Sequence, residues 1–258
     1  MTERTSLDGK VALITGANGA IGRATAALMA RRGAAIVAVD RPGSDFSGLG
    51  GLLPAGTRLE TVEADVGDEA SVARYVAAAR DAFGRIDIFF NNAGVEGVVQ
   101  PVEAYPLEAF RKVLDVNVVG VFLGLKHVLP VMYGQGSGCV VNCSSIAGLK
   151  GTPGLSAYTA SKHAVIGITR SVAAEAAPRG VRVVSVNPGP IESRMMDSIN
   201  AGQSPDAKAA HAAVAAMVPQ QRYGTVEEVA ELVAFLASDA AGYCTGGVYS
   251  VDGGMCAI

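Results

Sequence analysis

The chain has no tryptophan and few metal-binding side chains, with four cysteines and three histidines among 258 residues. The histidines are scattered, and the cysteines lack the C-x-x-C spacing of zinc sites. We therefore expect no metal site. Free thiols in a reducing compartment are the simplest interpretation of the cysteines, which are Cys139, Cys143, Cys244 and Cys256.

Strong charge and long apolar segments are also lacking. A net charge of −3 gives no electrostatic reason to expect nucleic acid or an anionic membrane as a partner. The stretch MTERTSLDGK at the N-terminus is polar and lacks the apolar centre of a signal peptide. No apolar run is expected to reach the length of a membrane span. Together these features predict a cytoplasmic protein that binds neither nucleic acid nor membrane.

Apolar strand patterns alternate with helix patterns along the whole chain. Hydrophobic residues make up 50% of it, which is enough for a sizeable core. Repeated β-α-β units with nearly continuous apolar strands predict one Rossmann-type, doubly wound α/β domain over 1–258. Its seven-stranded parallel sheet would carry helices on both faces. The predicted strands are KVALIT, AAIVAVD, RLETVEAD, RIDIFFNNAG, GCVVNCSS, VRVVSVNPG and GGVYSVDGG.

Two helical regions raise specific expectations. A long pattern over Leu107–Tyr133 contains Pro130, which we expect to kink the helix or end it early. The least regular stretch, about 190–223, follows the carboxyl end of a strand, where α/β folds bind ligands. We expect a substrate flap there, and the alternative is a surface helical excursion.

The stretch TGANGAIG, from Thr15 to Gly22, predicts a phosphate-binding turn between the first strand and the first helix. Ala20 stands where such a turn usually has glycine. A Cβ fits where φ is negative, and we expect Gly19 to supply any positive φ that the turn needs. The predicted cofactor contacts from this turn are Gly16, Asn18, Gly19, Ala20, Ile21 and Gly22.

Asp40 ends the second predicted strand, where a carboxylate accepts both hydroxyls of an adenosine ribose and repels a 2′-phosphate. NAD is therefore predicted over NADP. Arg41 favours NADP instead, because its guanidinium can bind a phosphate. We include both residues among the cofactor contacts, while an ordinary turn residue remains the alternative for Asp40.

The stretch SAYTASK places Tyr158 and Lys162 four residues apart on one helical face. A phenol with a pKa of about 10 is a poor acid–base group at neutral pH, and a nearby ammonium lowers that pKa. Ser144 and Ser145 end the preceding strand, so a serine hydroxyl reaches the same sheet edge. The alternative is a surface tyrosine–lysine pair with a serine that caps a turn.

Further motifs follow in a fixed order: N-N-A-G at 91–94, a helical Asn117, Ser145, the Tyr158/Lys162 pair, and Pro188-Gly189. With the glycine turn they make the chain resemble the short-chain dehydrogenase/reductase family over nearly its whole length. Ser145 fits the family's usual offset before the tyrosine better than Ser144. Taken singly, the 91–94 motif is also explained as a turn, and Asn117 as a buried polar residue that bridges backbone groups.

The resemblance implies specific roles. Tyr158 would be the general acid/base, and Ser145 would hydrogen-bond the substrate oxygen. Lys162 would lower the pKa of the tyrosine and hold the nicotinamide ribose, and Asn117 would order a water relay that resupplies the proton. A homotetramer is also implied. Beyond Tyr158 and Lys162, the further cofactor contacts would be Asp65, Val66, Asn91, Ala93, Gly94, Pro188, Gly189, Ile191 and Ser193, the last where the family usually has threonine.

The substrate pocket is predicted beside the nicotinamide. Its mainly apolar lining predicts a hydrophobic ketone or secondary alcohol, and methionines accommodate varied shapes. Glu96 either orients a polar group of the substrate or forms an ion pair at the rim of the pocket. The stretches NNAGVEG and 221–243 most resemble family members that act on cyclic alcohols and ketones, such as levodione reductases. The predicted lining is Val95, Glu96, Ile146, Ala147, Pro190, Met195 and Met196.

The expected activity is hydride transfer between NAD(H) and such an alcohol or ketone. One alternative is a 3-oxoacyl-carrier-protein reductase, which would prefer NADPH and a basic docking patch. Asp40 speaks against it, and Arg111 and Lys112 make only a thin patch. The other alternative is a catalytically silent nucleotide-binding scaffold or sensor. The complete Ser/Tyr/Lys/Asn set speaks against that, because a scaffold has no need of an acid–base phenol.

Overall fold

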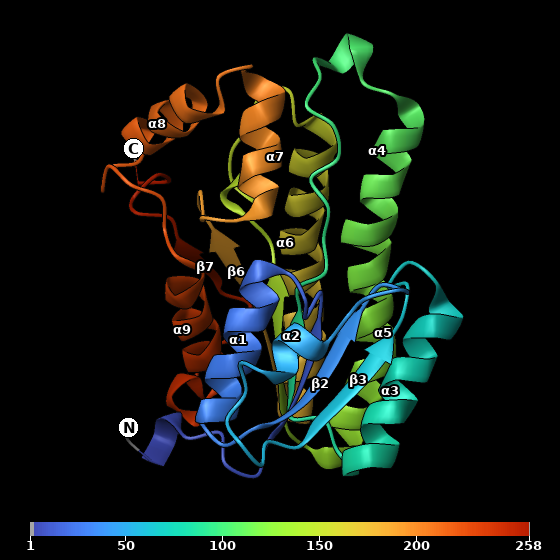
Figure 1. Ribbon diagram of the computed structural model, residues 1–258. Helices are drawn as coiled ribbons and strands as arrows, with labels where there is room; N and C mark the ends of the chain where they lie inside the picture. Colours follow the sequence, from blue (N-terminus) through green and yellow to red (C-terminus); the bar gives the residue numbers. More distant parts are fainter. Residues whose placement is uncertain (1–2, 258) are drawn as a thin grey trace.

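The computed structural model describes residues 3–257, in which one sheet lies between two layers of helices (Figure 1). The sheet has the strand order β3-β2-β1-β4-β5-β6-β7, and every neighbouring pair is parallel. The predicted doubly wound fold with seven strands is thus confirmed. The strands are β1 Val11–Thr15, β2 Ala35–Asp40, β3 Leu59–Glu63, β4 Ile88–Asn91, β5 Gly138–Cys143, β6 Val181–Pro188 and β7 Val248–Val251.

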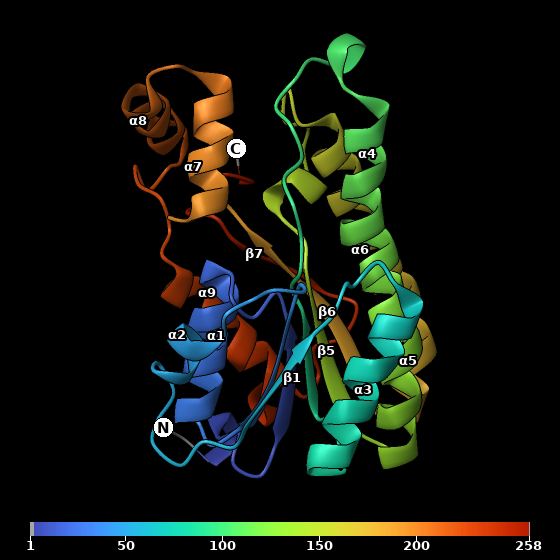
Figure 2. The same cartoon turned by 45° about the vertical axis from the view of Figure 1, so that its right-hand side comes forward.

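Helices cover both faces of the sheet. Helices α1 and α9 lie on one face and α3, α5 and α6 on the other (Figure 2), and each layer has its own apolar core. The strand order changes direction between β1 and β4, which is where doubly wound sheets bind ligands. The helices are α1 Ala20–Arg31, α2 Ser47–Gly50, α3 Glu69–Phe83, α4 Leu107–Leu114, α5 Gly120–Gln135, α6 Ser156–Ala176, α7 Arg194–Gln203, α8 Ala207–Met217 and α9 Val226–Ala237.

The sequence signals for helix ends hold closely at α3. The Asp68 side chain caps the helix by accepting from the backbone N–H of Ser71 at 2.8 Å. Gly84, with a φ of 74°, ends it in the left-handed conformation that favours glycine. Helix α3 therefore has a cap at each end.

The expectation for Pro130 is wrong, because α5 continues past it to Gln135. Pro130 is exposed. Proline has no N–H to donate to the carbonyl one turn earlier, and on this exposed side water can bind that carbonyl instead. The helix ends instead at Gly136, whose φ is 67°. A π-helical turn at Asp115–Val119, which the sequence pattern did not indicate, joins α4 to α5.

The expectation about apolar runs also needs correction. On length and composition alone, the stretch Leu107–Gln135 is long and apolar enough to cross a membrane. Half of its most apolar window is buried inside the protein, and α5 packs against α3 and α6. Its apolar residues therefore form part of the core between helices and sheet.

The stretch predicted as a flap is helical. Helices α7 and α8 lie beyond the carboxyl ends of the strands, beside the C-terminus (Figure 1). The side chains of Asn200 and Tyr223 hydrogen-bond each other at 3.1 and 3.2 Å and tie α7 to the segment after α8. The pair of helices forms one wall above the sheet edge, opposite α4 (Figure 2).

Candidate active site

The glycine turn has its positive φ at Gly16, where φ is 64°. The expectation that Gly19 supplies it is wrong, since Gly19 has a φ of −67° and is extended. Ala20 begins α1, and Gln221 is the only non-glycine residue in 3–257 with a positive φ. The Ala20 backbone therefore has a conformation that any residue adopts, as expected, and its side chain is exposed.

Gly22 is the position that tolerates no side chain. A Cβ there would lie 2.2 Å from the carbonyl oxygen of Gly16, so the turn packs directly on the first turn of α1. Helix α1 has no side-chain cap and no acidic residue in its first turn. Its first N–H groups are thus available to an anion, and the turn fits a dinucleotide pyrophosphate.

Thr15 and Asn92, which were not among the predicted site residues, hold this turn against the segment that follows β4. The Thr15 hydroxyl accepts from the backbone N–H groups of Asn92 and Ala93 at 3.0 and 3.1 Å. The Asn92 side chain donates to the carbonyls of Thr15 and Gly16 at 3.0 and 3.2 Å. Both residues belong to the recognised motifs, but the bonds join segments far apart in the chain, so local spacing does not reveal them.

Asp40 ends β2 beside the turn. Its carboxylate accepts from the backbone N–H groups of Asn18 and Arg41, both at 2.8 Å, and from the Ser44 hydroxyl at 3.3 Å. A carboxylate has about four acceptor sites, and these three bonds use three of them, so one site on Oδ2 remains for a ribose hydroxyl. Asp40 thus also works as the turn residue that the sequence analysis offered as its alternative.

The side chains predicted to contact the cofactor differ in their burial and in their hydrogen bonds. The Asn91 side chain is buried and donates to the carbonyl of Val121 at 3.1 Å and to Asn142 at 3.3 Å, so it is used within the fold. Asp65 is exposed and accepts from the backbone N–H of Gly67 at 2.9 Å. Val66 packs closely on Gly120. The cofactor contact expected of Asp65 and Val66 stays a prediction.

The two serines after β5 have different surroundings. The Ser144 hydroxyl is buried and donates to the carbonyl of Lys162 at 2.9 Å, so it joins β5 to α6. The Ser145 hydroxyl is partly exposed, accepts from the backbone N–H of Ala147 at 3.1 Å and has a long contact of 3.5 Å to the carbonyl of Pro188. Its proton is therefore held less firmly than that of Ser144, and the predicted contact of Ser145 with a substrate oxygen stays a prediction.

Tyr158 and Lys162 lie one turn apart on α6, and both are buried. The ammonium of Lys162 donates to the carbonyl of Cys143 at 2.8 Å and lies 5.5 Å from the centre of the Tyr158 ring. Burial raises the pKa of Tyr158, and the hydrogen bond with Ser145 lowers it. Burial also lowers the pKa of Lys162. Burial is the largest effect on the phenol, and the expected lowering of its pKa by Lys162 is not among the causes of the shift.

Asn117 lies in the π-helical turn with its side chain fully bonded. The side-chain amide donates to the carbonyl of Val95 at 2.9 Å and to the Ser161 hydroxyl at 3.0 Å. Its oxygen accepts from the backbone N–H of Val95 at 2.8 Å. The side chain thus fixes the loop after β4 onto α6, which is the bridging role named as the alternative. Its part in a water relay stays a prediction.

An apolar cluster surrounds Tyr158, as the predicted pocket requires. Ala147, Met195 and Met196 pack in it, so those three predicted lining residues are brought together. Val95 and Glu96 approach from the loop after β4, while Ile146 is buried beside Ala147. Pro190 lines a separate hollow of about 270 Å³ near the end of the chain. The cluster also contains three residues that sequence reasoning missed, namely Val99, Leu155 and Ile199.

The last predicted cofactor contacts lie in and after β6, from Pro188 to Ser193. The Gly189 N–H donates to the carbonyl of Val251 at 3.0 Å, and a Cβ at Gly189 would lie 2.8 Å from the Cα of Asp252. Ile191 is buried. The Ser193 hydroxyl caps α7 by accepting from the Met196 N–H at 3.4 Å. Serine at this position therefore has a structural use beside its predicted cofactor contact.

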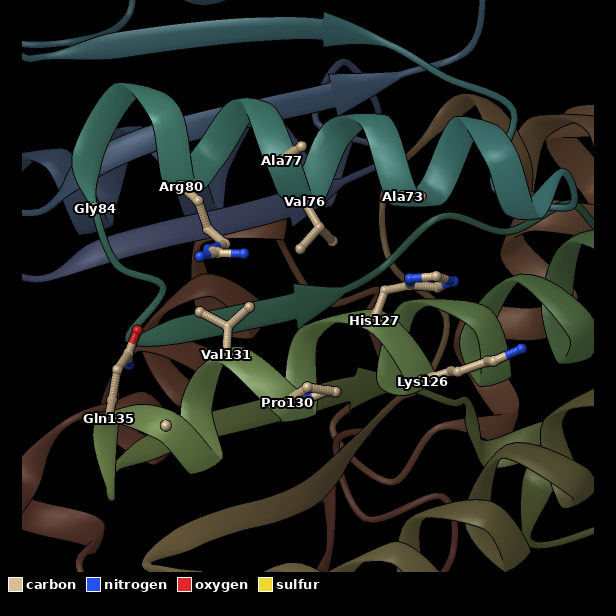
Figure 3. A pocket seen from close by; sticks show the side chains of 11 residues that line it. Ala73, Val76, Ala77, Arg80, Gly84, Lys126, His127, Pro130, Val131 and Gln135 are labelled. Atoms are coloured by element: carbon tan, nitrogen blue, oxygen red, sulfur yellow. The ribbon is translucent and has the colours of Figure 1, made fainter.

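The other hollows lie away from these residues. A groove of about 530 Å³ runs between α3 and α5, with Arg80, Lys126 and His127 on its walls (Figure 3). It contains none of the predicted site residues. Within residues 3–257, no group of three or more His, Cys, Asp and Glu side chains is placed to hold a metal ion.

The comparisons with known proteins place this site in a family. A family model described as enoyl-(acyl carrier protein) reductase matches residues 16–256. The chain belongs to the short-chain dehydrogenase/reductase family. It is therefore an oxidoreductase of a family that binds nicotinamide cofactors.

Its relatives are similar over nearly the whole chain. Levodione reductase of Leifsonia aquatica is 42% identical over 98% of this chain and 96% of its own. The crystal structure of levodione reductase matches with a TM-score of 0.95 at 40% identity, over 97% of this chain and 98% of that one. Cis-4-hydroxycyclohexanecarboxylate dehydrogenase of Sinomonas cyclohexanicum is 41% identical over 96% and 97%. NAD⁺-bound xylitol dehydrogenase has a TM-score of 0.92 at 36% identity, over 96% and 99%.

Proposed function

We propose that this protein oxidises a hydrophobic, cyclic secondary alcohol with NAD and reduces the corresponding ketone with NADH. The observation that carries the proposal is the position of Tyr158. Its phenol lies in an apolar cluster with Lys162 one turn away and Ser145 close enough to hydrogen-bond it. The relatives named for levodione and for a hydroxycyclohexane acid support a cyclic substrate.

The residues present fit a dinucleotide. Gly16 and Gly22 let a phosphate approach the uncapped start of α1, and Asp40 would take a ribose hydroxyl. The remaining predicted contacts, from Asp65 to Ser193, would follow along the sheet edge. A bound nicotinamide supplies the hydride acceptor for alcohol oxidation and the hydride donor for ketone reduction.

The side chains supply the proton chemistry. In oxidation the Tyr158 phenolate takes the hydroxyl proton as the carbinol C–H bond breaks and the C=O bond forms. In reduction the Tyr158 hydroxyl returns that proton to the substrate oxygen. The Ser145 hydroxyl donates a hydrogen bond to the same oxygen and stabilises its developing charge. The Lys162 ammonium stabilises the phenolate by its charge, and the apolar wall keeps water from the reacting atoms.

NAD is proposed over NADP because Asp40 places a negative charge where a 2′-phosphate would lie. NAD⁺ is the cofactor named in the related xylitol dehydrogenase structure. The same charge speaks against the 3-oxoacyl-carrier-protein reductase alternative, which would use NADPH. Arg41 is exposed and its side chain makes no hydrogen bond with another residue of 3–257, so it is available to a phosphate and limits the expected preference.

We also propose a cytoplasmic homotetramer. Two large apolar side chains on or next to the start of α5 support self-association, because Val119 is 39% exposed and Phe122 is 53% exposed. Sedimentation at micromolar concentration tests the assembly: a tetramer is expected, and a monomer would refute it.

A panel of secondary alcohols tests the activity. Cyclohexanol and substituted cyclohexanols should reduce NAD, as followed by the absorbance of the reduced cofactor, and faster than they reduce NADP. An open-chain alcohol such as 2-butanol is the matched comparison for the ring. Absence of turnover with every alcohol and with either cofactor would refute the proposed function.

A further inference from the structure

One carboxylate faces the apolar cluster around Tyr158 with little to neutralise it. Glu96 is 9% exposed as a residue, and its side chain 12%. Among residues 3–257 no hydrogen-bond donor reaches its oxygens. The one ionic contact is to Arg194, at 3.8 Å, and the Arg194 side chain is itself 84% exposed. The carboxylate oxygens of Glu96 keep some contact with solvent, so water can bind them and a substrate hydroxyl can take the place of that water.

The backbone around Glu96 is held on both sides. Val95 forms two hydrogen bonds with the Asn117 side chain. Gly97 has a φ of 76°, and a Cβ there would lie 2.5 Å from the Tyr105 hydroxyl, so the turn is tightly enclosed. The carboxylate is therefore presented by a fixed loop rather than by a mobile one, which suits a specificity contact.

Three observations relate the carboxylate to the cluster around Tyr158. Arg194 directly precedes Met195 and Met196, which pack on the cluster with Tyr158. Val99, which follows Glu96 in the same loop, also packs on the cluster with Tyr158. Gly202 of α7 lies against Val99. The charge of Glu96 raises the pKa of Tyr158, which places the two groups within electrostatic range.

We propose that Glu96 selects the substrate by accepting a hydrogen bond from a second, neutral hydroxyl on the substrate ring. The substrate class is thus a cyclic hydroxyketone or diol. This inference rests on the proposed function. An anionic substituent would be repelled by Glu96. A cationic one, although attracted by Glu96, would have to carry its charge into the apolar cluster near the Lys162 ammonium, where desolvation and repulsion oppose it. A purely hydrocarbon ring would leave the carboxylate without a partner.

Steady-state reduction of matched cyclohexanones with NADH tests the assignment. For the wild type, kcat/KM should be at least about tenfold higher for the better of 3- and 4-hydroxycyclohexanone than for cyclohexanone, the size of a hydrogen bond to a charged group. It should be at least about tenfold lower for 4-oxocyclohexanecarboxylate than for cyclohexanone. 4-Aminocyclohexanone should gain nothing over cyclohexanone.

Glu96→Gln removes the charge and keeps the size. It should lower the preference for the hydroxyketone over cyclohexanone at least about fivefold and raise activity on the carboxylate relative to cyclohexanone. Glu103→Gln, at an exposed acid of the same connection, is the control and should change none of these ratios. Ratios that stay within about twofold in Glu96→Gln, or a wild type that prefers the carboxylate or the amine, would overturn the assignment. Reduction of none of these ketones would instead refute the proposed function, and the assignment with it.

Discussion

The ammonium of Lys162 lies 5.5 Å from the centre of the Tyr158 ring and is fixed by a 2.8 Å hydrogen bond to the carbonyl of Cys143. The lysine is 4% exposed and the tyrosine 9%. A cation is thus held next to a phenol in a place with little water, where charge interactions are stronger than at a surface. The dependence of activity on pH follows from this pair.

Alcohol oxidation should accelerate as pH rises into the alkaline range, whereas ketone reduction should slow down. Burial raises the pKa of Tyr158, so the phenol keeps its proton at neutral pH, and oxidation needs the deprotonated form. Profiles of kcat/KM against pH in both directions measure this. Lys162→Met should move the alkaline rise of oxidation to higher pH. Oxidation that is fastest at or below neutral pH would contradict the assignment.

Asp40→Asn should lower the preference for NAD over NADP by about tenfold or more. The asparagine still accepts from the backbone N–H of Asn18 but no longer repels a phosphate. Asp40→Ala also removes that acceptor, so it should raise the KM for both cofactors. The ratio of kcat/KM values for NAD and NADP is the measurement. An unchanged ratio in Asp40→Asn would show that the residue serves only the turn.

Two substitutions in the glycine turn should have opposite outcomes. Gly22→Ala puts a Cβ 2.2 Å from the Gly16 carbonyl oxygen, so it should weaken NAD binding at least about tenfold and lower the melting temperature. Ala20→Gly should change NAD affinity by less than about threefold, because Ala20 is exposed and has no positive φ. Calorimetric titration with NAD checks both. A large loss of affinity in Ala20→Gly would mean that the methyl group takes part in the phosphate site.

Asn117→Ala should reduce the free energy of unfolding by about 1–3 kcal/mol, because it leaves the N–H and the carbonyl of Val95 without partners. Ser161→Ala removes one of the bonds of Asn117 and should cost less. Urea denaturation measures both variants. Equal stability of Asn117→Ala and the wild type would show that the loop after β4 does not depend on this side chain.

Most strands and the placing of Tyr158 and Lys162 on one helical face were predictable because both are local patterns. An apolar run of five or six residues between turn signals indicates a buried strand, and residues four apart share a face of a helix. The choice of Ser145 over Ser144 came from the motif offset and stays a prediction.

The remaining features depend on contacts between distant segments. Pro130 is compatible with α5 because its ring faces solvent, which depends on how the helix packs. The positive φ lies at Gly16 and not at Gly19, and Gly16 passes close to Asn92 and Ala93 in the segment directly after β4. The Asn91 side chain donates to the carbonyl of Val121, which is 30 residues away in the chain. None of these contacts has a signature in nearby sequence.

The central claim is that Tyr158 carries the proton in hydride transfer between NAD and a cyclic alcohol. The most direct test compares the wild type with Tyr158→Phe, using cyclohexanol with NAD and the absorbance of NADH. If the Tyr158 hydroxyl carries the proton, the variant should keep its affinity for NAD within about threefold and lose at least about a thousandfold in kcat. A variant that retains activity comparable to the wild type would contradict it.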